Sequence, residues 1–204
     1  MQKKTMTAAF FWCLGVLILT LTLTLAGSAD LYDSVIRLHV LANSDGAEDQ
    51  AAKLLVRDEV LSYCRAHFSL SDRDEAEAEI RRDLDGIRAA AEAKLREAGS
   101  ADAVTVTLDR ETYPTRVYDN LSLPAGTYVS LRVMIGAAEG KNWWCVLFPP
   151  MCLDSSTDAE GALLDAGMSE ENVKTVTLDG EPYRIRFRIL EWAAELREKF
   201  KREI

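Results

Sequence analysis

Few residues of this chain belong to the types that usually carry catalysis. Only two histidines occur, His39 and His67. His39 lies on the polar side of a short alternating segment, and His67 lies near the expected end of a helix, where a cation interacts favourably with the helix dipole. A nucleophile pair of Cys145 and His39 is conceivable, but no local motif of a thiol protease accompanies it. We therefore interpret both histidines as structural or solvent-facing residues.

Common motifs of catalytic and nucleotide-binding sites are missing from the sequence. It contains no Walker loop, no G-x-G-x-x-G, no H-E-x-x-H and no G-x-S-x-G. Asn43, Asp45, Glu48 and Asp49 offer oxygen atoms, but their order is not that of a calcium loop, and a turn followed by a helix cap explains them. We expect no catalytic residue, no metal and no cofactor.

Two of the four cysteines are close enough in sequence to pair. Cys145 and Cys152 enclose six residues, including two adjacent prolines that could turn the chain back. In an oxidising compartment the two could form a disulfide, and two reduced, buried thiols are the alternative. Cys13 and Cys64 have no obvious partner.

The first 29 residues indicate export. Lys3 and Lys4 form a basic start, and residues 8–25 carry no charge. Small residues then lead up to Ala29, after which a signal peptidase could cut. We expect residues 1–29 to be a signal peptide or, because the apolar stretch is long, an uncleaved anchor that contacts the membrane through residues 8–25. In both cases residues 30–204 lie outside the cytoplasm.

Length and charge set limits on the exported part. About 175 residues suit a single domain with its own core. The formal net charge of the whole chain is −9, and without Lys3 and Lys4 it is −11. Such an acidic domain repels phosphate backbones, so we expect no nucleic acid partner.

The elements that must position these residues begin with a strand and two helices. Val35–Leu41 alternates apolar with polar residues, as a half-buried strand does. A helix over Asp49–Phe68, capped by Asp45, follows it. A second helix, capped by Ser71, continues to Gly99, since apolar residues recur at spacings of three and four.

Strands dominate the second half of the chain. Val104–Leu108, Val129–Ile135 and Trp143–Phe148 predict an antiparallel meander, in which the adjacent Trp143 and Trp144 point to opposite faces. After them we expect a loop over Asp154–Asn172 with a short helix at Ala159–Ala166, a hairpin of Val173–Leu178 with Tyr183–Ile189, and a terminal helix from Leu190. A helix from Pro182 onward is the rival for the second hairpin strand. The fold class is therefore α+β: an N-terminal strand and two helices, a mainly antiparallel sheet and a C-terminal helix.

Several segments resemble the stage II sporulation protein R family. They are IRLHVLANSD at 36–45, EDQ at 48–50, KLLVRD at 53–58, YPTRVY at 113–118, LPAG at 123–126 and GKNWWCVLFPP at 140–150. The last segment is the most specific, because two tryptophans, a cysteine and a double proline in that order are improbable from composition alone.

The resemblance implies a signalling protein and not an enzyme. Such a protein is made in the forespore and exported into the space between the two membranes around it. There it activates a membrane-embedded aspartic protease of the mother cell, which matures a sporulation sigma factor from its precursor. We expect residues 30–204 to bind the extracytoplasmic face of that protease through a surface that includes Arg116, Asn142 and Trp143. A secreted hydrolase using Cys145 or a carboxylate pair, and a structural envelope protein, are the alternatives.

Overall fold

The computed structural model describes residues 31–118, 121–150, 159–165 and 167–177, with residues 12, 14–16 and 18–19 near the N-terminus. Cleavage after Ala29, the partner cysteine Cys152, and the expected strand and helix beyond Thr177 lie outside the described residues. None of the helices within the described residues is both long enough and apolar enough to cross a membrane.

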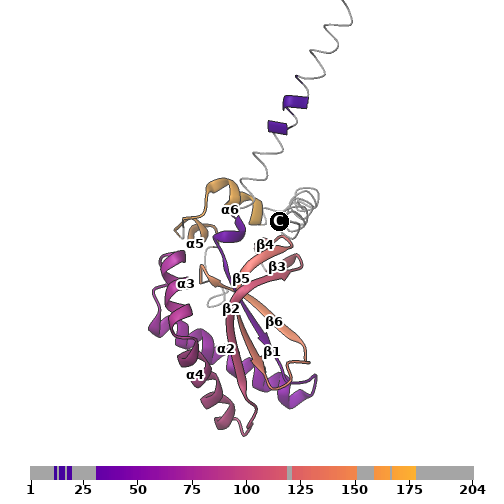
Figure 1. The fold of residues 1–204 in the computed structure, drawn as a ribbon, viewed down its shortest axis with the longest axis vertical. Coiled ribbons are helices and arrows are strands. Elements are labelled where there is room, and N and C mark those ends of the chain that lie inside the picture. The colour runs from indigo at the N-terminus through magenta and orange to yellow at the C-terminus, as the bar shows by residue number, and fades with distance from the viewer. Residues whose placement is uncertain are drawn as a thin grey trace, which may run out of the picture.

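Six strands and five helices have named bounds in the described chain. The strands are β1 (Ile36–Leu41), β2 (Val104–Tyr113), β3 (Arg116–Tyr118), β4 (Leu121–Leu123), β5 (Gly126–Ile135) and β6 (Asn142–Phe148). The helices are α2 (Ala47–His67), α3 (Arg73–Arg82), α4 (Leu84–Glu97), α5 (Ala159–Asp165) and α6 (Glu170–Val176). The α+β class expected from the sequence is confirmed (Figure 1).

The main sheet has the strand order β2-β5-β1-β6, and β3 with β4 forms a second, two-stranded sheet. β5 runs antiparallel to β2 and parallel to β1, and β6 runs antiparallel to β1. The expected meander is therefore wrong at one point, because β1 lies between β5 and β6. The six-residue connection after Ile135 crosses the end of β1, where Glu139 and Gly140 donate backbone hydrogen bonds to Asn43 and Ala42.

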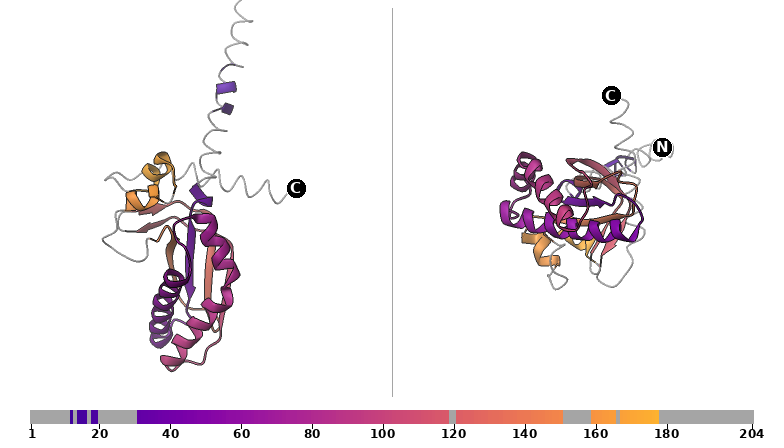
Figure 2. Two further views of the ribbon diagram at one scale, coloured as in Figure 1. Left: turned by 90° about the vertical axis from the view of Figure 1, so that its left-hand side faces the viewer. Right: turned by 90° about the horizontal axis from the view of Figure 1, so that it is seen from below.

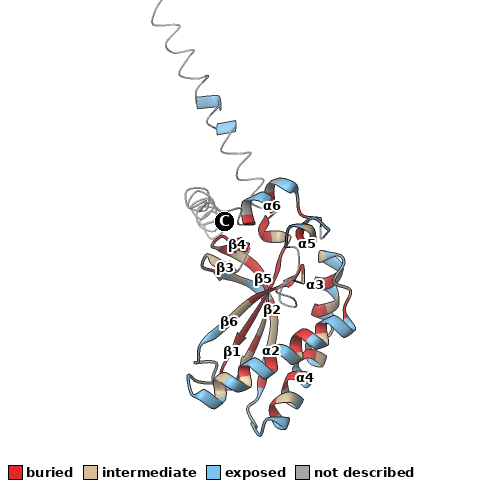
Figure 3. Ribbon diagram, turned by 180° about the vertical axis from the view of Figure 1, so that it is seen from behind, coloured by how far each residue is buried: buried red, intermediate tan, exposed pale blue. Residues whose placement is uncertain are grey.

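Helices α2, α3 and α4 cover one face of this sheet (Figures 1 and 2). Along α2, α3 and α4 buried residues alternate with exposed ones (Figure 3), as expected of helices that pack one side on a sheet. The core between helices and sheet includes Ile36, Leu38, Val40, Val56, Val60, Ile80, Ile87, Leu95, Leu131 and Val133. The period-two and period-3.6 patterns of the sequence therefore identify this core correctly.

The single helix expected over residues 71–99 is wrong, because Asp83 interrupts it. Asp83 has φ −125° and ψ 35°, which ends α3 and starts α4. Its carboxylate accepts a hydrogen bond of 2.7 Å from the Tyr63 hydroxyl of α2, and the missing side chain of Gly86 leaves room for that hydroxyl. A contact with another helix thus overrides local helix propensity.

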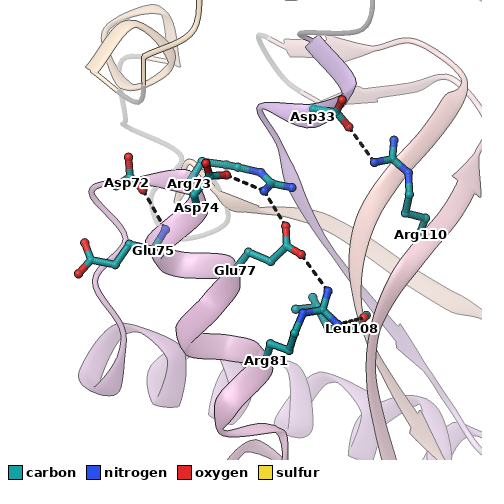
Figure 4. A network of polar contacts seen from close by, with 9 residues as sticks. All are labelled: Asp33, Asp72, Arg73, Asp74, Glu75, Glu77, Arg81, Leu108 and Arg110. Carbon is teal, nitrogen blue, oxygen red and sulfur yellow. Dashed lines mark hydrogen bonds and ion pairs between the residues drawn. The ribbon is translucent and has the colours of Figure 1, made fainter.

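Two expected helix caps are also wrong. Asp72, and not Ser71, caps α3 by accepting the backbone N–H of Glu75 (Figure 4). The N-cap of α2 is Gly46, while the Asp45 carboxylate accepts the backbone N–H of Lys141 in the β5–β6 connection. Asp45 therefore stabilises a long-range contact.

Side chains of α3 and of the segment before β1 hold the edge strand β2 (Figure 4). Arg81 binds Glu77 of its own helix and donates to the Leu108 carbonyl of β2. Two residues further along β2, Arg110 pairs with Asp33 at 2.8 Å. These contacts fix the half of β2 that carries Glu111.

The other face of the sheet is covered at one end by β3, β4, α5 and α6. A second apolar cluster lies there and includes Leu31, Tyr32, Val35, Tyr113, Leu121, Leu123, Tyr128, Val146, Leu163, Met168, Val173 and Val176. The short helix expected near Ala159 is confirmed as α5, whereas the strand expected from Val173 is wrong. Residues 170–176 are helical because Ser169 caps them and Val173 and Val176, three apart, share a buried side.

Candidate functional site

Six segments carry the family resemblance, and four of them, at 36–45, 113–118, 123–126 and 140–150, lie in the strands and turns around the sheet face that α2–α4 leave uncovered. The other two, at 48–50 and 53–58, lie on α2. In the β1–β6 pair, His39 lies opposite Trp144, and Leu41 lies opposite Asn142. We call the polar and aromatic side chains of this region the open-face cluster. Its members are Arg37, His39, Glu111, Tyr113, Arg116, Tyr118, Ser130, Arg132, Asn142 and Trp144.

The β5–β6 connection fixes one end of the cluster. The Asn43 side-chain oxygen accepts the Ala137 backbone N–H at 2.9 Å, and Asp45 accepts that of Lys141 at 2.7 Å. Gly140 packs so closely that a Cβ there would overlap the Ser44 carbonyl group. The start of β6, and with it Asn142, is therefore held against the end of β1.

His39 is at the centre of the cluster and only 5% exposed. Its Nδ1 lies 2.9 Å from the Glu111 carboxylate, and its Nε2 lies 3.0 Å from the side-chain oxygen of Asn142. The ring also packs at 5.4 Å from that of Trp144. Because both ring nitrogens are engaged, neither faces a substrate as a free base.

Glu111 joins three strands through its carboxylate. Besides His39 of β1, it accepts a hydrogen bond of 2.8 Å from the Ser130 hydroxyl of β5 and lies 3.5 Å from Arg132 Nε. Burial raises the pKa of Glu111, but the hydrogen bonds from His39 and Ser130 and the nearby positive charges outweigh it, so the pKa lies below its ordinary 4.5. Glu111 is therefore ionised at neutral pH and unsuited to act as a general acid.

Arg37 is a fully buried cation in an aromatic environment. Its Nη2 donates to the Tyr118 hydroxyl at 2.6 Å, and its Nε donates to the Cys145 carbonyl at 3.3 Å. The guanidinium lies 4.2 Å above the ring centre of Tyr113 and 5.1 Å from that of Tyr128. Within the described chain no carboxylate pairs with it, so tyrosine rings and neutral oxygens stabilise the charge.

Arg116 and Trp144 form the outer part of the cluster. The Arg116 guanidinium lies 3.7 Å from the Trp144 ring centre, and both residues are partly exposed. Stacking of this kind orients a guanidinium while its N–H edges remain able to donate hydrogen bonds.

The structure separates the three binding residues expected from the sequence. Asn142 and Arg116 both belong to the open-face cluster. Trp143 lies opposite Val40 on the helix-covered face, partly buried, with Arg57 5.0 Å from its ring. Trp144 is the tryptophan that shares a face with the other two.

Cys145 does not form the pair with His39 that the sequence allowed. It lies opposite Leu38, whose side chain is in the helix-side core, so it points away from His39. Cys145 is also disulfide-bonded, and a bonded sulfur cannot act as a nucleophile. The partner sulfur is outside the described residues, so pairing with Cys152 stays a prediction.

Sequence reasoning missed Arg37, Glu111, Ser130 and Arg132. One signal for the first existed: Arg37 and His39 are polar residues within a central, otherwise apolar strand, and such residues need partners. Nothing in the sequence of β2 distinguishes Glu111 from its exposed polar neighbours. Among the described residues, no group of three or more His, Cys, Asp or Glu side chains could hold a metal ion.

Comparison with known proteins assigns the family. The family model described as stage II sporulation protein R matches residues 32–158, which contain every segment named above. Stage II sporulation protein R of Bacillus subtilis (strain 168) is 32% identical over 186 residues, covering 80% of this chain and 82% of that protein. No solved structure matches the chain significantly. The chain therefore belongs to the stage II sporulation protein R family, and its role is in sporulation.

Proposed function

We propose that this chain is an extracytoplasmic sporulation signal without catalytic activity of its own. It is exported from the forespore into the space between the two membranes and binds the extracytoplasmic face of a membrane-embedded aspartic protease of the mother cell. Binding favours the active state of the protease, which then matures a sporulation sigma factor from its precursor. Family membership supports the sporulation role, and the basic, then apolar, N-terminal sequence supports export.

One observation on the structure carries the proposal of a binding protein: the acid–base groups of the open-face cluster are occupied by one another. His39 bonds Glu111 and Asn142, and the Ser130 hydroxyl bonds Glu111 and Tyr113. Ser130 is fully buried, so its hydroxyl is inaccessible to a substrate. The hydrogen bonds among these side chains make this part of the surface rigid. The nucleophile of a hydrolase is hydrogen-bonded to its base, whereas the Ser130 hydroxyl bonds a carboxylate and a tyrosine.

A ligand shifts a conformational equilibrium only by its differential affinity for the two states. A rigid surface suits this role, because little binding energy is lost in ordering it. We assign the contact to the outer part of the open-face cluster, which includes Arg116 and Asn142, joined there by Trp144. Trp143 belongs to the opposite face and serves as the comparison residue.

The test is precursor processing in cells that produce the protease and the sigma factor precursor. An immunoblot compares cells with this protein, cells without it, and cells with a version lacking residues 2–29. We expect processing only with the full chain. Processing that does not need the protein, or that proceeds equally without export, would contradict the proposal and return the hydrolase and envelope alternatives.

A matched pair of variants tests which face of the sheet contacts the protease. Trp144→Ala is expected to lower processing strongly while the protein stays folded, whereas Trp143→Ala is expected to lower stability more than signalling per folded molecule. Circular dichroism and the amount of protein in the cell control for folding. The opposite order, with a folded Trp143→Ala variant inactive and Trp144→Ala fully active, would move the contact to the helix-covered side.

A further inference from the structure

Unpaired hydrogen-bond donors are concentrated in the open-face cluster. In the described chain four buried side-chain nitrogens have no hydrogen-bond partner, and all belong to arginines. Three of them are in this cluster: Arg37 Nη1, Arg116 Nε and Arg132 Nε. A buried donor without an acceptor destabilises a folded protein. Arg37 is fully buried, and Arg132 Nε lies 3.5 Å from the Glu111 carboxylate. Arg116, which is partly exposed, is therefore the arginine of the cluster that most needs an acceptor from outside the described chain.

The charges of the open-face cluster also indicate that it can accept an acidic partner. It holds three arginines but a single carboxylate, Glu111, whose oxygens already serve His39, Ser130 and Arg132. Arg116 has no ion-pair partner among the described residues. The surface is therefore locally short of negative charge, although the whole chain carries −9.

Strand pairing gives the spacing of the two partly exposed arginines. Arg132 of β5 lies beside His39 of β1, and His39 lies beside Trp144 of β6. Because neighbouring strands are about 4.8 Å apart, Arg132 and the Trp144 that carries Arg116 are separated by about 10 Å. On an extended segment, residues two or four positions apart share a face and lie about 7 or 13 Å apart, at roughly 3.3 Å per residue, which brackets this distance.

We propose that Arg116 and Arg132 bind two carboxylates of an extended acidic segment in the extracytoplasmic part of the partner, with Trp144, on which Arg116 stacks, packing against that segment. The identity of the partner as the protease rests on the proposed function; the chemistry of the contact rests on the cluster alone. Guanidinium groups bind carboxylates through paired hydrogen bonds, which would give Arg116 an acceptor that the described chain does not provide. Nucleic acid and anionic membranes are disfavoured as occupants, because the acidic body repels extended polyanions.

Charge reversal tests the proposal in the same processing assay. Arg116→Glu and Arg132→Glu are each expected to lower processing about tenfold or more, because like charges then meet across the contact. Arg88→Glu is the matched control: this arginine is half exposed on α4, on the other side of the sheet, and among the described residues it pairs with Asp85. It is expected to leave processing unchanged. Arg116→Gln and Arg132→Gln, which remove charge without repulsion, serve where a glutamate prevents folding.

A compensating charge reversal in the protease, which restores processing, identifies the carboxylates that bind the two arginines. Each Asp and Glu in the extracytoplasmic loops of the protease is changed to Arg, singly, in cells with the Arg116→Glu or the Arg132→Glu chain. Recovery with one acidic position for each arginine supports the proposal. Normal processing with folded Arg116→Glu and Arg132→Glu variants, or recovery with none of the positions, overturns it. Processing that never required the wild-type chain refutes the proposed function instead, so the two failures are distinguishable.

Discussion

Replacing Glu111 with glutamine tests whether its carboxylate holds the open-face cluster together. The substitution keeps the shape of the side chain and removes its charge. In the wild type one carboxylate oxygen faces His39 and Arg132, while the other accepts from Ser130. A glutamine has a single acceptor oxygen, so one of these two directions must lose its acceptor.

The expected loss of folding stability in Glu111→Gln follows from those contacts. A hydrogen bond to a charged group contributes about 1.5–3 kcal/mol to stability, and Glu111 is only 21% exposed, so solvent screens the contact weakly. Losing one such bond and weakening the other should lower the free energy of unfolding by about 2–3 kcal/mol at neutral pH. Urea unfolding followed by circular dichroism measures this difference directly.

The pH dependence gives a second readout with a defined sign. The pKa of Glu111 is lower in the folded protein than the ordinary 4.5. Its contribution to stability is therefore fully present above the unfolded-state pKa and disappears as pH falls through the folded-state pKa. The stability gap between wild type and Glu111→Gln should narrow below about pH 4.5. A gap under about 0.5 kcal/mol at neutral pH, or one that stays constant into the acid range, would refute the assigned role.

Two further predictions concern packing. Gly140→Ala should destabilise the protein by about 1–3 kcal/mol, because the added Cβ overlaps the Ser44 carbonyl group. Gly46→Ala is the comparison, because its Cβ would lie 3.2 Å from the Ser44 hydroxyl, and it should cost less than about 1 kcal/mol. Equal losses on urea unfolding would argue against a tight connection at Gly140. Cys64 is buried, and burial raises the pKa of its thiol to about 12. It should resist alkylation near pH 9 in the folded protein and react once urea unfolds it; rapid labelling of the native protein, read by mass spectrometry, would contradict this burial.

Periodicity predicted those parts of the fold that depend on neighbours along the chain. The alternation in Val35–Leu41 gave the strand β1, and the spacing of Ile80, Ile87 and Leu95 gave the helix face that packs on the sheet. The break at Asp83 depends on Tyr63, twenty residues away, so no local pattern could show it.

The order of the strands in the sheet was harder to predict from the sequence, because strands that pair are distant from one another along the chain. β5 and β6 are consecutive and look like a hairpin, yet β1, which is buried along almost its whole length, takes the central position between them. Burial on both sides favours that position for an apolar strand, but alternation alone does not rank strands by position.

The candidate site was predictable only in part. Arg116 and Asn142 were named from motifs that do meet in space. Adjacent tryptophans had to point to opposite faces, but which one shares a face with Asn142 depends on strand register, and register places Trp144 there. Glu111 comes from a strand with no marked motif and reaches His39 only through the fold.

The central position of β1 has a consequence for the order of folding. Residues of β1 pair with residues of its parallel partner β5 that lie 93 positions later, as Ile36 with Val129 shows, and its other neighbour, β6, follows after that. During synthesis β1 is therefore made first, and it cannot pair until both neighbouring strands have been made. Closing such long loops is slow compared with forming local contacts. The sheet cannot close before Phe148 is free. If the chain is exported as proposed, this late closure would leave the sheet open while the chain passes through a translocation channel.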